Sequence, residues 1–412
     1  MKIIYISVLA LSSFLLGCNL LPFGQKKENN DMLLAALGIL ALNASDWVWD
    51  LPPGFPTPVV PAENPMSRAK VELGRHLFYE KRLSGNVTMS CGSCHFQSLA
   101  FADGKEFPSG ITGDFHPRNA QHLGNVAYLP RLTWNNPNMT SLEVQARVPM
   151  FGDNPVELGL GQVSEAVYFG RLKSDPLYVS LFTNAYGNGD AAVNEQNIRF
   201  AIASFQRSMI TGWSNFDKIQ NRRAVNLSSE QIASINRGND FFNGENAECF
   251  HCHGGFNFTD TNLHTGQVTS EFAYHNNGTH TEAYYNSLNN VHKEGLKELT
   301  GLQSDQGKFK APSLRNVGLT FPYMHDGSIQ CDNAENPANT PGKTNADCAR
   351  HALGKVLDQY STGGAAHPNK DATLIRAFPQ GMSPTERADM INFLMALTDE
   401  EFVNSPKFAN PF

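Results

Sequence analysis

The sequence predicts a mostly α-helical protein with long loops, organised as two similar modules in tandem. Apolar residues recur at helical spacing in several segments, for example Ile198, Ile202 and Phe205, whereas alternating strand patterns are sparse. A five-residue motif, in which two cysteines two positions apart are followed at once by histidine, occurs at 91–95 and again at 249–253. The helical periodicity and the repeated motif together predict the tandem helical architecture.

The repeated motif is the attachment pattern of c-type haem, in which both thiols form thioethers and the histidine becomes the proximal iron ligand. A metal knuckle or a disulfide pair is the alternative, but two copies in one chain, each ending in histidine, favour haem. The attachment residues that we expect are Cys91, Cys94, His95, Cys249, Cys252 and His253. The prediction is therefore two tandem cytochrome c-like haem domains with long loops.

Length and composition fit a soluble globular protein with two domains, because the chain has 412 residues, of which 41% are hydrophobic and 17% charged. A net charge of −7 provides no general basic patch, which argues against a nucleic-acid partner. We expect four segments: a lipoprotein signal peptide at 1–17, a tether and Pro-rich lead-in at 18–65, the first haem domain at 66–222 and the second at 223–412.

The N-terminus has the pattern of an exported lipoprotein. Lys2 precedes an apolar run at 3–16, which is too short for an ordinary membrane span and is typical of a signal peptide. Residues 15–18, Leu-Leu-Gly-Cys, resemble the bacterial lipobox, in which the cysteine, here Cys18, carries the lipid. An ordinary signal peptide with an incidental cysteine is the alternative. Asn19 in place of aspartate favours an outer-membrane anchor facing the periplasm.

The remaining cysteines predict a disulfide. Of seven cysteines, Cys18 is assigned to lipid and four to haem, which leaves Cys331 and Cys348 in a segment rich in Asn, Pro, Gly and Thr. In an oxidising compartment we expect these two to form a bridge that closes the segment, with free thiols as the alternative.

The expected elements follow in chain order. The Pro-rich stretch 51–58 excludes helix and central strand, and a helix at 69–79 leads to the first motif. An amphipathic helix at 196–209 closes the first domain. Capping boxes at 228–231 and 383–386 start the helix before the second motif and the last long helix.

The far-side ligand of each haem decides the chemistry. Iron with two protein ligands passes electrons, whereas an open sixth position can bind a small oxidant. Near the first motif the candidates are His116 and His122. Near the second they are Met324, His325, Tyr360 and Met382.

From about residue 65 to residue 399 the chain resembles the bacterial di-haem cytochrome c peroxidases and their MauG-type relatives. The motifs that carry the resemblance are both pentapeptides and the segments 72–78, 83–86, 117–119, 314–317 and 322–327. The resemblance implies that the first haem reacts with hydrogen peroxide and that the second relays or stores oxidising equivalents.

The resemblance also assigns roles near the first haem. Glu157 is the candidate catalytic acid/base and Gln145 its companion, although two residues are inserted between Pro149 and Glu157 compared with the family pattern. The alternative for Glu157 is a helix-start carboxylate after Pro155. Trp134 falls where the family has a tryptophan between its haems, with core packing as the alternative.

Two further sites are implied. Asn119, with the carbonyl groups of Thr320 and Pro322, matches the family's calcium site. Tyr360 occupies the position of the second haem's far ligand, which is methionine in the peroxidases and tyrosine in MauG-type members. Met324 is expected to be a packing residue. A surface or supporting role is favoured for His116, and ligation of the first haem by His116 stays open.

The expected function is that of a periplasm-facing di-haem peroxidase that reduces hydrogen peroxide. A small cytochrome or copper protein would donate the electrons. The alternatives are a MauG-type oxidase that modifies a protein substrate and a pure electron-transfer di-haem lipoprotein.

Overall fold

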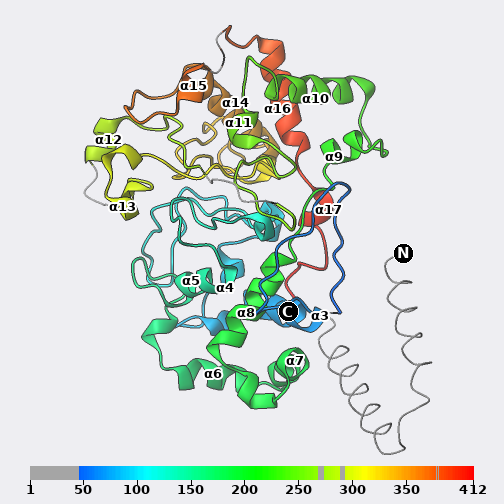
Figure 1. The fold of residues 1–412 in the computed structure, drawn as a ribbon, viewed down its shortest axis with the longest axis vertical. Helices are drawn as coiled ribbons and strands as arrows, with labels where there is room; N and C mark the ends of the chain where they lie inside the picture. The colour runs from blue at the N-terminus through cyan, green and yellow to red at the C-terminus, as the bar shows by residue number, and fades with distance from the viewer. Residues whose placement is uncertain (1–45, 268–272, 288–292, 377, 379) are drawn as a thin grey trace, which may run out of the picture. The chain divides into compact units, whose positions relative to one another are not determined.

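The computed structural model describes residues 46–267, 273–287, 293–376, 378 and 380–412, and Val48–Phe412 forms one compact unit (Figure 1). Within these described residues the extended pairing consists of isolated β-bridges, such as that between Phe96 and Ala102. The predicted mostly α-helical class with long loops is therefore confirmed. The signal peptide and the lipid-bearing Cys18 lie outside the described residues.

The helices are of two kinds, longer ones that build the cores and short ones in the loops. The longer helices are α3 (Arg68–Tyr79), α6 (Glu165–Lys173), α7 (Pro176–Tyr186), α8 (Glu195–Arg207), α10 (Ser229–Phe242), α14 (Asn345–Ser361) and α16 (Pro384–Ala396). The shorter ones are α4 (Leu142–Gln145), α5 (Arg147–Phe151), α9 (Asn215–Gln220), α11 (Phe250–His253), α12 (Glu282–Ser287), α13 (Lys297–Thr300), α15 (Ala372–Arg376) and α17 (Glu400–Val403). The 3₁₀ turns are η1 (Lys81–Leu83), η2 (Cys91–Ser93), η3 (Gln97–Leu99), η4 (Val126–Tyr128), η5 (Leu160–Gln162), η6 (Gly189–Ala192), η8 (Gln303–Asp305) and η9 (Val317–Leu319). In the part of the chain that the structure describes, no helix combines the length and the hydropathy that crossing a membrane requires.

Helix starts follow the capping signals of the sequence. In α10 and α16 the serine before the helix accepts a hydrogen bond from the N–H three residues on, and that residue's side chain accepts one from the serine N–H. Both predicted capping boxes are therefore confirmed. The predicted helix at 196–209 is α8, whose first turn is capped by the side chain of Asn194.

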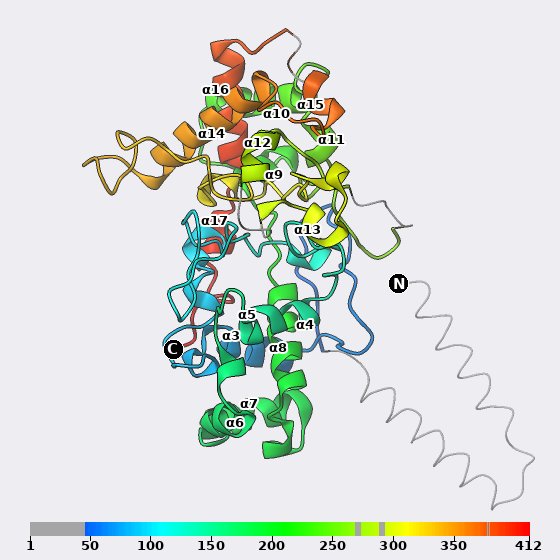
Figure 2. The ribbon, with the colours of Figure 1, turned by 90° about the vertical axis from the view of Figure 1, so that its left-hand side faces the viewer.

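The first core forms where α3 crosses α8. A β-carbon added at Gly74 would lie 1.9 Å from the carbonyl oxygen of Ala201, so the close approach of the two helices requires glycine there. Leu73, Leu77 and Phe205 are fully buried beside the crossing. In both views α3 and α8 lie side by side (Figures 1 and 2).

The second core repeats this arrangement with α10 and α16. A β-carbon at Gly238 would lie 2.1 Å from a backbone oxygen of α16. Phe242 packs on Phe393 with ring centroids 5.3 Å apart, as Phe78 packs on Phe205 at 5.4 Å in the first core. The repeat seen in the motifs therefore extends to the helix pair that supports each of them.

The C-terminal segment returns to the first core after α16. Phe402 and Phe408 pack there, although α16 belongs to the second core. Asp399, 1% exposed, holds the crossing point, since one carboxylate oxygen accepts hydrogen bonds of 2.9 Å from the Thr211 hydroxyl and from the next two backbone N–H groups. The two cores are therefore joined by the end of the chain as well as by the link between α8 and α9.

The Pro-rich lead-in packs on the body of the protein. The ring of Phe55 lies 4.8 Å from that of Phe256, and the Tyr128 hydroxyl donates a 2.8 Å hydrogen bond to the carbonyl group of Pro56. The stretch 51–58 is therefore an ordered part of the compact unit.

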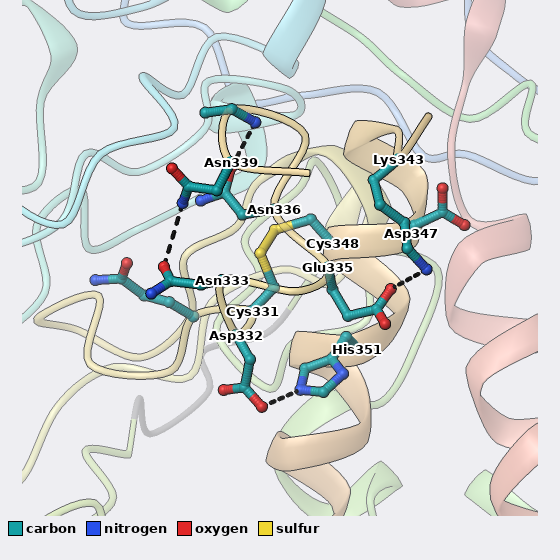
Figure 3. The surroundings of a disulfide bond; sticks show 12 residues. Cys331, Asp332, Asn333, Glu335, Asn336, Asn339, Lys343, Asp347, Cys348 and His351 are labelled. Carbon is teal, nitrogen blue, oxygen red and sulfur yellow. Dashed lines mark hydrogen bonds and ion pairs between the residues drawn. A yellow bond between two sulfur atoms is a disulfide. The ribbon is translucent and has the colours of Figure 1, made fainter. Parts of the chain in front are cut away.

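The loop that precedes α14 is closed by a disulfide between Cys331 and Cys348, as predicted. It projects from the body in Figure 2. Figure 3 shows its two ends held together beside the disulfide, with Asp332 paired to His351 at 3.1 Å. Glu335 pairs with Lys343 at 2.7 Å, so ion pairs and a covalent bond stabilise the same short loop.

Candidate functional site

The first motif forms the turn η2 and continues to His95. His95 Nδ1 lies 2.6 Å from the carbonyl oxygen of Phe101, a residue in the left-handed region with φ +66°. Because a carbonyl only accepts, Nδ1 carries the proton, and Nε2 is the nitrogen that remains to bind a metal. Cys91 and Cys94 are free thiols, and burial raises the pKa of Cys91 to about 12.

The second motif repeats this geometry in α11. His253 Nδ1 lies 3.2 Å from the carbonyl oxygen of Phe258 and 3.1 Å from that of Pro312, which again leaves Nε2. Cys249 and Cys252 are free. Both motifs therefore present two thiols and an oriented imidazole.

A cavity of about 230 Å³ opens beside the second motif. Leu353 and Leu357 from α14 and Leu394 from α16 line it, and His253 lies on its wall with both cysteines of the motif. Walls of this kind bury a large apolar group and exclude water from it.

Tyr360, near the end of α14, lines the same cavity, and burial raises its pKa to about 12. Asn277 Nδ2 lies 3.3 Å from the Tyr360 hydroxyl oxygen and 3.3 Å from Met324 Sδ. Met324 also lines the cavity, whereas Met382 packs against the second core. The structure therefore brings the predicted tyrosine to the second motif, with one methionine as its neighbour.

The cavity wall also carries ionisable groups that the sequence analysis did not identify. His275 lies between two carboxylates, with Nε2 2.7 Å from Asp260 Oδ2 and Nδ1 2.7 Å from Asp371 Oδ2. Burial opposes the charged imidazole, but these hydrogen bonds raise the pKa of His275 to about 11. Lys310 is 2% exposed, and burial lowers its pKa to about 8. One signal was present, because Asp260 follows the second motif as Asp103 follows the first.

Trp134 lies on the wall of this cavity together with the three residues expected to bind calcium. Its indole Nε1 donates a 2.8 Å hydrogen bond to the carbonyl group of Asn119. Asn119 Nδ2 donates to the carbonyl group of Lys105 at 2.6 Å. Thr320 and Pro322 line the cavity as well, so the structure brings together residues that are about 200 positions apart in the sequence.

Glu157 lies beside the first motif. Burial and the nearby Glu157 carboxylate raise the pKa of the Cys94 thiol to about 11. Burial raises the pKa of Glu157 itself to about 7. Backbone hydrogen bonds position it, since Ile111 N–H donates to the Glu157 carbonyl at 2.9 Å and Leu158 N–H donates to the Pro149 carbonyl at 2.8 Å.

Gln145 ends α4, and a second carboxylate lies within that helix. Glu143 is 4% exposed, with Oε1 2.7 Å from both Arg207 Nη2 and Asn64 Nδ2. Burial opposes its charge, but Arg207 and Asn64 hold the pKa of Glu143 below its usual value. Glu143 therefore fastens α4 to α8, whereas Glu157 is poised to exchange a proton near neutral pH.

The two histidines considered for the first motif lie in different places. His122 lines the cavity beside the second motif, so its expected place near the first motif is corrected. Burial lowers the pKa of His122 to about 4. His116 Nδ1 accepts a 3.2 Å hydrogen bond from the Arg118 N–H.

Comparison with known proteins identifies the family. Residues 68–224 match the family described as di-haem cytochrome c peroxidase. Over 391 residues the chain is 32% identical to cytochrome-c peroxidase IdrP1 of Pseudomonas sp. (strain SCT), a match that covers 90% of this chain and 92% of that protein. The chain belongs to the di-haem cytochrome c peroxidase family.

MauG proteins are also similar to this di-haem cytochrome c peroxidase family member. The methylamine utilization protein MauG of Methylorubrum extorquens is 30% identical over 340 residues, covering 82% of this chain and 81% of that protein. A solved structure of a MauG-like protein associated with microbial copper homeostasis superposes with a TM-score of 0.77 at 36% identity, covering 89% of this chain and 99% of that chain.

Membership of the di-haem cytochrome c peroxidase family implies an oxidoreductase with two c-type haems. The residues present fit such groups on three counts. Each motif has free thiols, each motif histidine is anchored through Nδ1, and the second motif faces an apolar cavity. Cys91, Cys94 and His95 would hold one haem, and Cys249, Cys252 and His253 the other.

Proposed function

We propose that the protein reduces hydrogen peroxide at the haem held by Cys91, Cys94 and His95. The observation that carries this proposal is Glu157, a carboxyl group with a pKa of about 7 beside that motif. Reduction of hydrogen peroxide to two waters consumes two electrons and two protons. A carboxyl group that is half protonated near neutral pH can both accept and return a proton.

The bound haem supplies an iron centre for peroxide binding and electron exchange. Glu157 accepts the proton of one peroxide oxygen and delivers it to the other, so that the leaving oxygen departs as water rather than as hydroxide. Gln145, in the same segment, is assigned the orientation of peroxide by hydrogen bonding. Burial around Glu157 keeps bulk water from competing for its proton.

The second site is assigned to relaying or storing oxidising equivalents. In this proposal His253 and Tyr360 hold its iron from opposite sides. Trp134 provides a polarisable ring for electron passage between the two sites. Asn119, with the carbonyl oxygens of Thr320 and Pro322, is assigned to one calcium ion, because oxygen donors suit a hard cation.

Location and electron donor are further parts of the proposal. The sequence pattern at Cys18 supports a lipid anchor, with the enzyme facing the periplasm from the outer membrane. A small periplasmic cytochrome or copper protein would then be within reach as donor.

The test is a steady-state peroxide assay with reduced cytochrome c, run with and without prior reduction of the enzyme. We expect turnover without prior reduction. Electron paramagnetic resonance of the ferric enzyme should then show one high-spin and one low-spin signal. Two low-spin signals, with turnover only after reduction, would contradict an accessible first site.

A second candidate is MauG-type oxidation of a protein substrate, which the position of Tyr360 favours. A phenolate ligand stabilises ferric and higher states, so such a centre accepts electrons poorly from ordinary cytochromes. The similarity to MauG and to the MauG-like protein associated with copper homeostasis supports the same candidate. Slow turnover with cytochrome c, despite rapid reaction with peroxide, would favour it.

Tyr360→Phe tests the ligand assignment. The variant should change the low-spin signal, because removal of the hydroxyl oxygen removes the ligand atom. Tyr285→Phe is the matched control, since Tyr285 is also a buried tyrosine but lies between His280 and His367. An unchanged signal in Tyr360→Phe would refute the assignment.

A further inference from the structure

We infer that His280, His325 and Asp326 form a binding site for a divalent transition-metal ion such as Zn²⁺. Each residue offers one donor atom, and the three atoms lie within 4.8 Å of one another. None of the three residues is assigned to haem or to calcium in the proposed function. The inference therefore stands apart from the peroxide chemistry.

The donor distances are close to those that a metal needs. His280 Nε2 lies 2.5 Å from Asp326 Oδ2, and His325 Nε2 lies 4.0 Å from the same oxygen. A tetrahedral Zn²⁺ with bonds of about 2.0 to 2.2 Å separates its donor atoms by roughly 3.3 to 3.5 Å. Small side-chain rotations therefore convert the observed arrangement into a three-ligand site with a fourth position for water.

Both imidazole rings are already held in place. The His325 ring stacks on Phe309 with centroids 3.6 Å apart and an interplanar angle of 16°. The His280 ring stacks on Tyr284 at 3.8 Å and 21°. The other oxygen of Asp326, Oδ1, accepts a 3.1 Å hydrogen bond from the Ser328 N–H. Such supporting contacts orient ligands before a metal arrives and raise affinity.

The donor set selects the class of metal. Two imidazole nitrogens and one carboxylate oxygen suit Zn²⁺ and its transition-metal neighbours, whereas Ca²⁺ prefers six to eight oxygen donors. The side chains of His280, His325 and Asp326 are only 17%, 7% and 9% exposed, so bulk water competes weakly. The cationic Arg118 nearby is paired with Glu298, which offsets its repulsion of a metal ion.

A simple histidine–aspartate hydrogen bond is the competing explanation, and the protein contains one for comparison. His351 Nε2 lies 3.1 Å from Asp332 Oδ2 on the surface. The cluster at 280 differs because a second imidazole, that of His325, is held against the same carboxylate at a distance too long for a hydrogen bond.

The experiment uses the haem-loaded enzyme after treatment with a chelator and its removal. Zinc chloride is titrated by calorimetry, and bound zinc is counted by elemental analysis. We expect one Zn²⁺ per chain in the wild-type protein. His280→Ala and Asp326→Asn should weaken binding more than about 100-fold, because even changes behind the ligands cost 10- to 100-fold.

The control variants are His351→Ala, which removes the surface pair, and Asn119→Ala, which alters the calcium residues. Both should bind zinc as the wild type does. His280→Gln provides a further variant, since its amide can still donate to Asp326 while being a poor metal ligand. It should keep the fold and lose zinc.

Three results would overturn the inference: no retained zinc in the wild type, wild-type affinity in His280→Ala and His280→Gln, or equal loss of zinc in Asn119→Ala. The last would place the ion at the calcium residues. The proposed peroxide activity can fail without affecting any of these measurements, so the two proposals are tested separately.

Discussion

Two glutamates of the segment after Met139 illustrate how surroundings decide the role of a side chain. Glu143 is ion-paired to Arg207 and holds two helices together. In Glu157 burial of the carboxyl group raises the pKa to about 7. The same functional group is therefore a structural anion at one position and a proton carrier fourteen residues later.

Replacing Glu157 tests the proton-transfer role directly. In the wild type the peroxide reaction should rise with pH and level off above about 7, because the carboxylate must be ionised to accept a proton. Glu157→Gln should lower the rate about 100-fold or more and remove the inflection. Stopped-flow measurement of kcat/KM for peroxide between pH 5 and 9, on the order of the range spanned by the carboxyl titration, provides the check.

Glu143→Gln is the matched control for that experiment. It removes a buried carboxylate from the same segment, so it should lower thermal stability while leaving the midpoint of the pH profile in place. If both variants lose the inflection, the proton-carrier role of Glu157 is wrong.

Residue-level prediction succeeded where chemistry confines a site to neighbouring positions. The cysteines and histidine of each motif are consecutive, so their spacing alone indicated their role. His275 and Lys310 could not be found in this way, because packing between distant segments brings them to the cavity. His122 was placed at the wrong motif for the same reason: its position depends on which core its loop packs against.

At the scale of elements, the glycine crossings explain why the two modules share a helix pair. A methyl group at Gly74 would meet a backbone oxygen at 1.9 Å, and backbone cannot move aside as a flexible side chain can. The helices must separate, and the packing between them is lost.

Gly74→Ala should therefore destabilise the protein by about 3 kcal/mol, the upper end of the usual cost of overpacking a core. Thermal or urea unfolding measures this. Gly170→Ala in α6 is the control, because a β-carbon there meets nothing within 4 Å. It should be neutral or stabilise slightly, since alanine favours helix. Equal destabilisation by both variants would contradict the crossing as the cause.

The disulfide-closed loop allows a second test. The bridge spans 17 residues, and closing a loop of that size in the unfolded chain is worth about 3 kcal/mol. Cys331→Ser with Cys348→Ser should lower the urea midpoint. Dithiothreitol should lower the wild-type midpoint similarly and leave that of the double variant unchanged, because thioethers to haem are not reduced by thiols. A wild type insensitive to dithiothreitol would refute the contribution.

Elements were the best-predicted level of the structure. The capping boxes before α10 and α16 are local, and so are the apolar stripes of α3 and α8, which made these helices readable without knowledge of their partners. The bounds of the short loop helices were not predicted, since contacts with other segments stabilise them more than their own propensity does.

At the scale of the molecule, the two cores depend on each other through the C-terminal segment. Phe402 is 3% exposed and packs in the first core, more than 150 residues after the other members of that cluster. Tandem modules were predictable from the repeated motif. The return of the C-terminal segment was not, because apolar periodicity does not say which core a terminal phenylalanine joins.

Phe402→Ala should cost about 3 to 5 kcal/mol, as truncation of a buried phenylalanine does. Hydrogen exchange should show the loss of protection mainly in α3 and α8. Phe115→Ala is the control, since Phe115 is 71% exposed and should have little effect. Loss of protection confined to α10 and α16 would contradict the assignment of Phe402 to the first core.

The return of the C-terminal segment sets the order in which the molecule can mature. A ribosome or export channel releases residues 91–95 long before Phe402 and Phe408, so the first core stays incomplete until the last residues have emerged. During that interval Cys91 and Cys94, which are buried in the finished protein, are still accessible to the machinery that attaches haem. Completion of the chain then closes the first module around its cofactor, and synthesis itself times the closure.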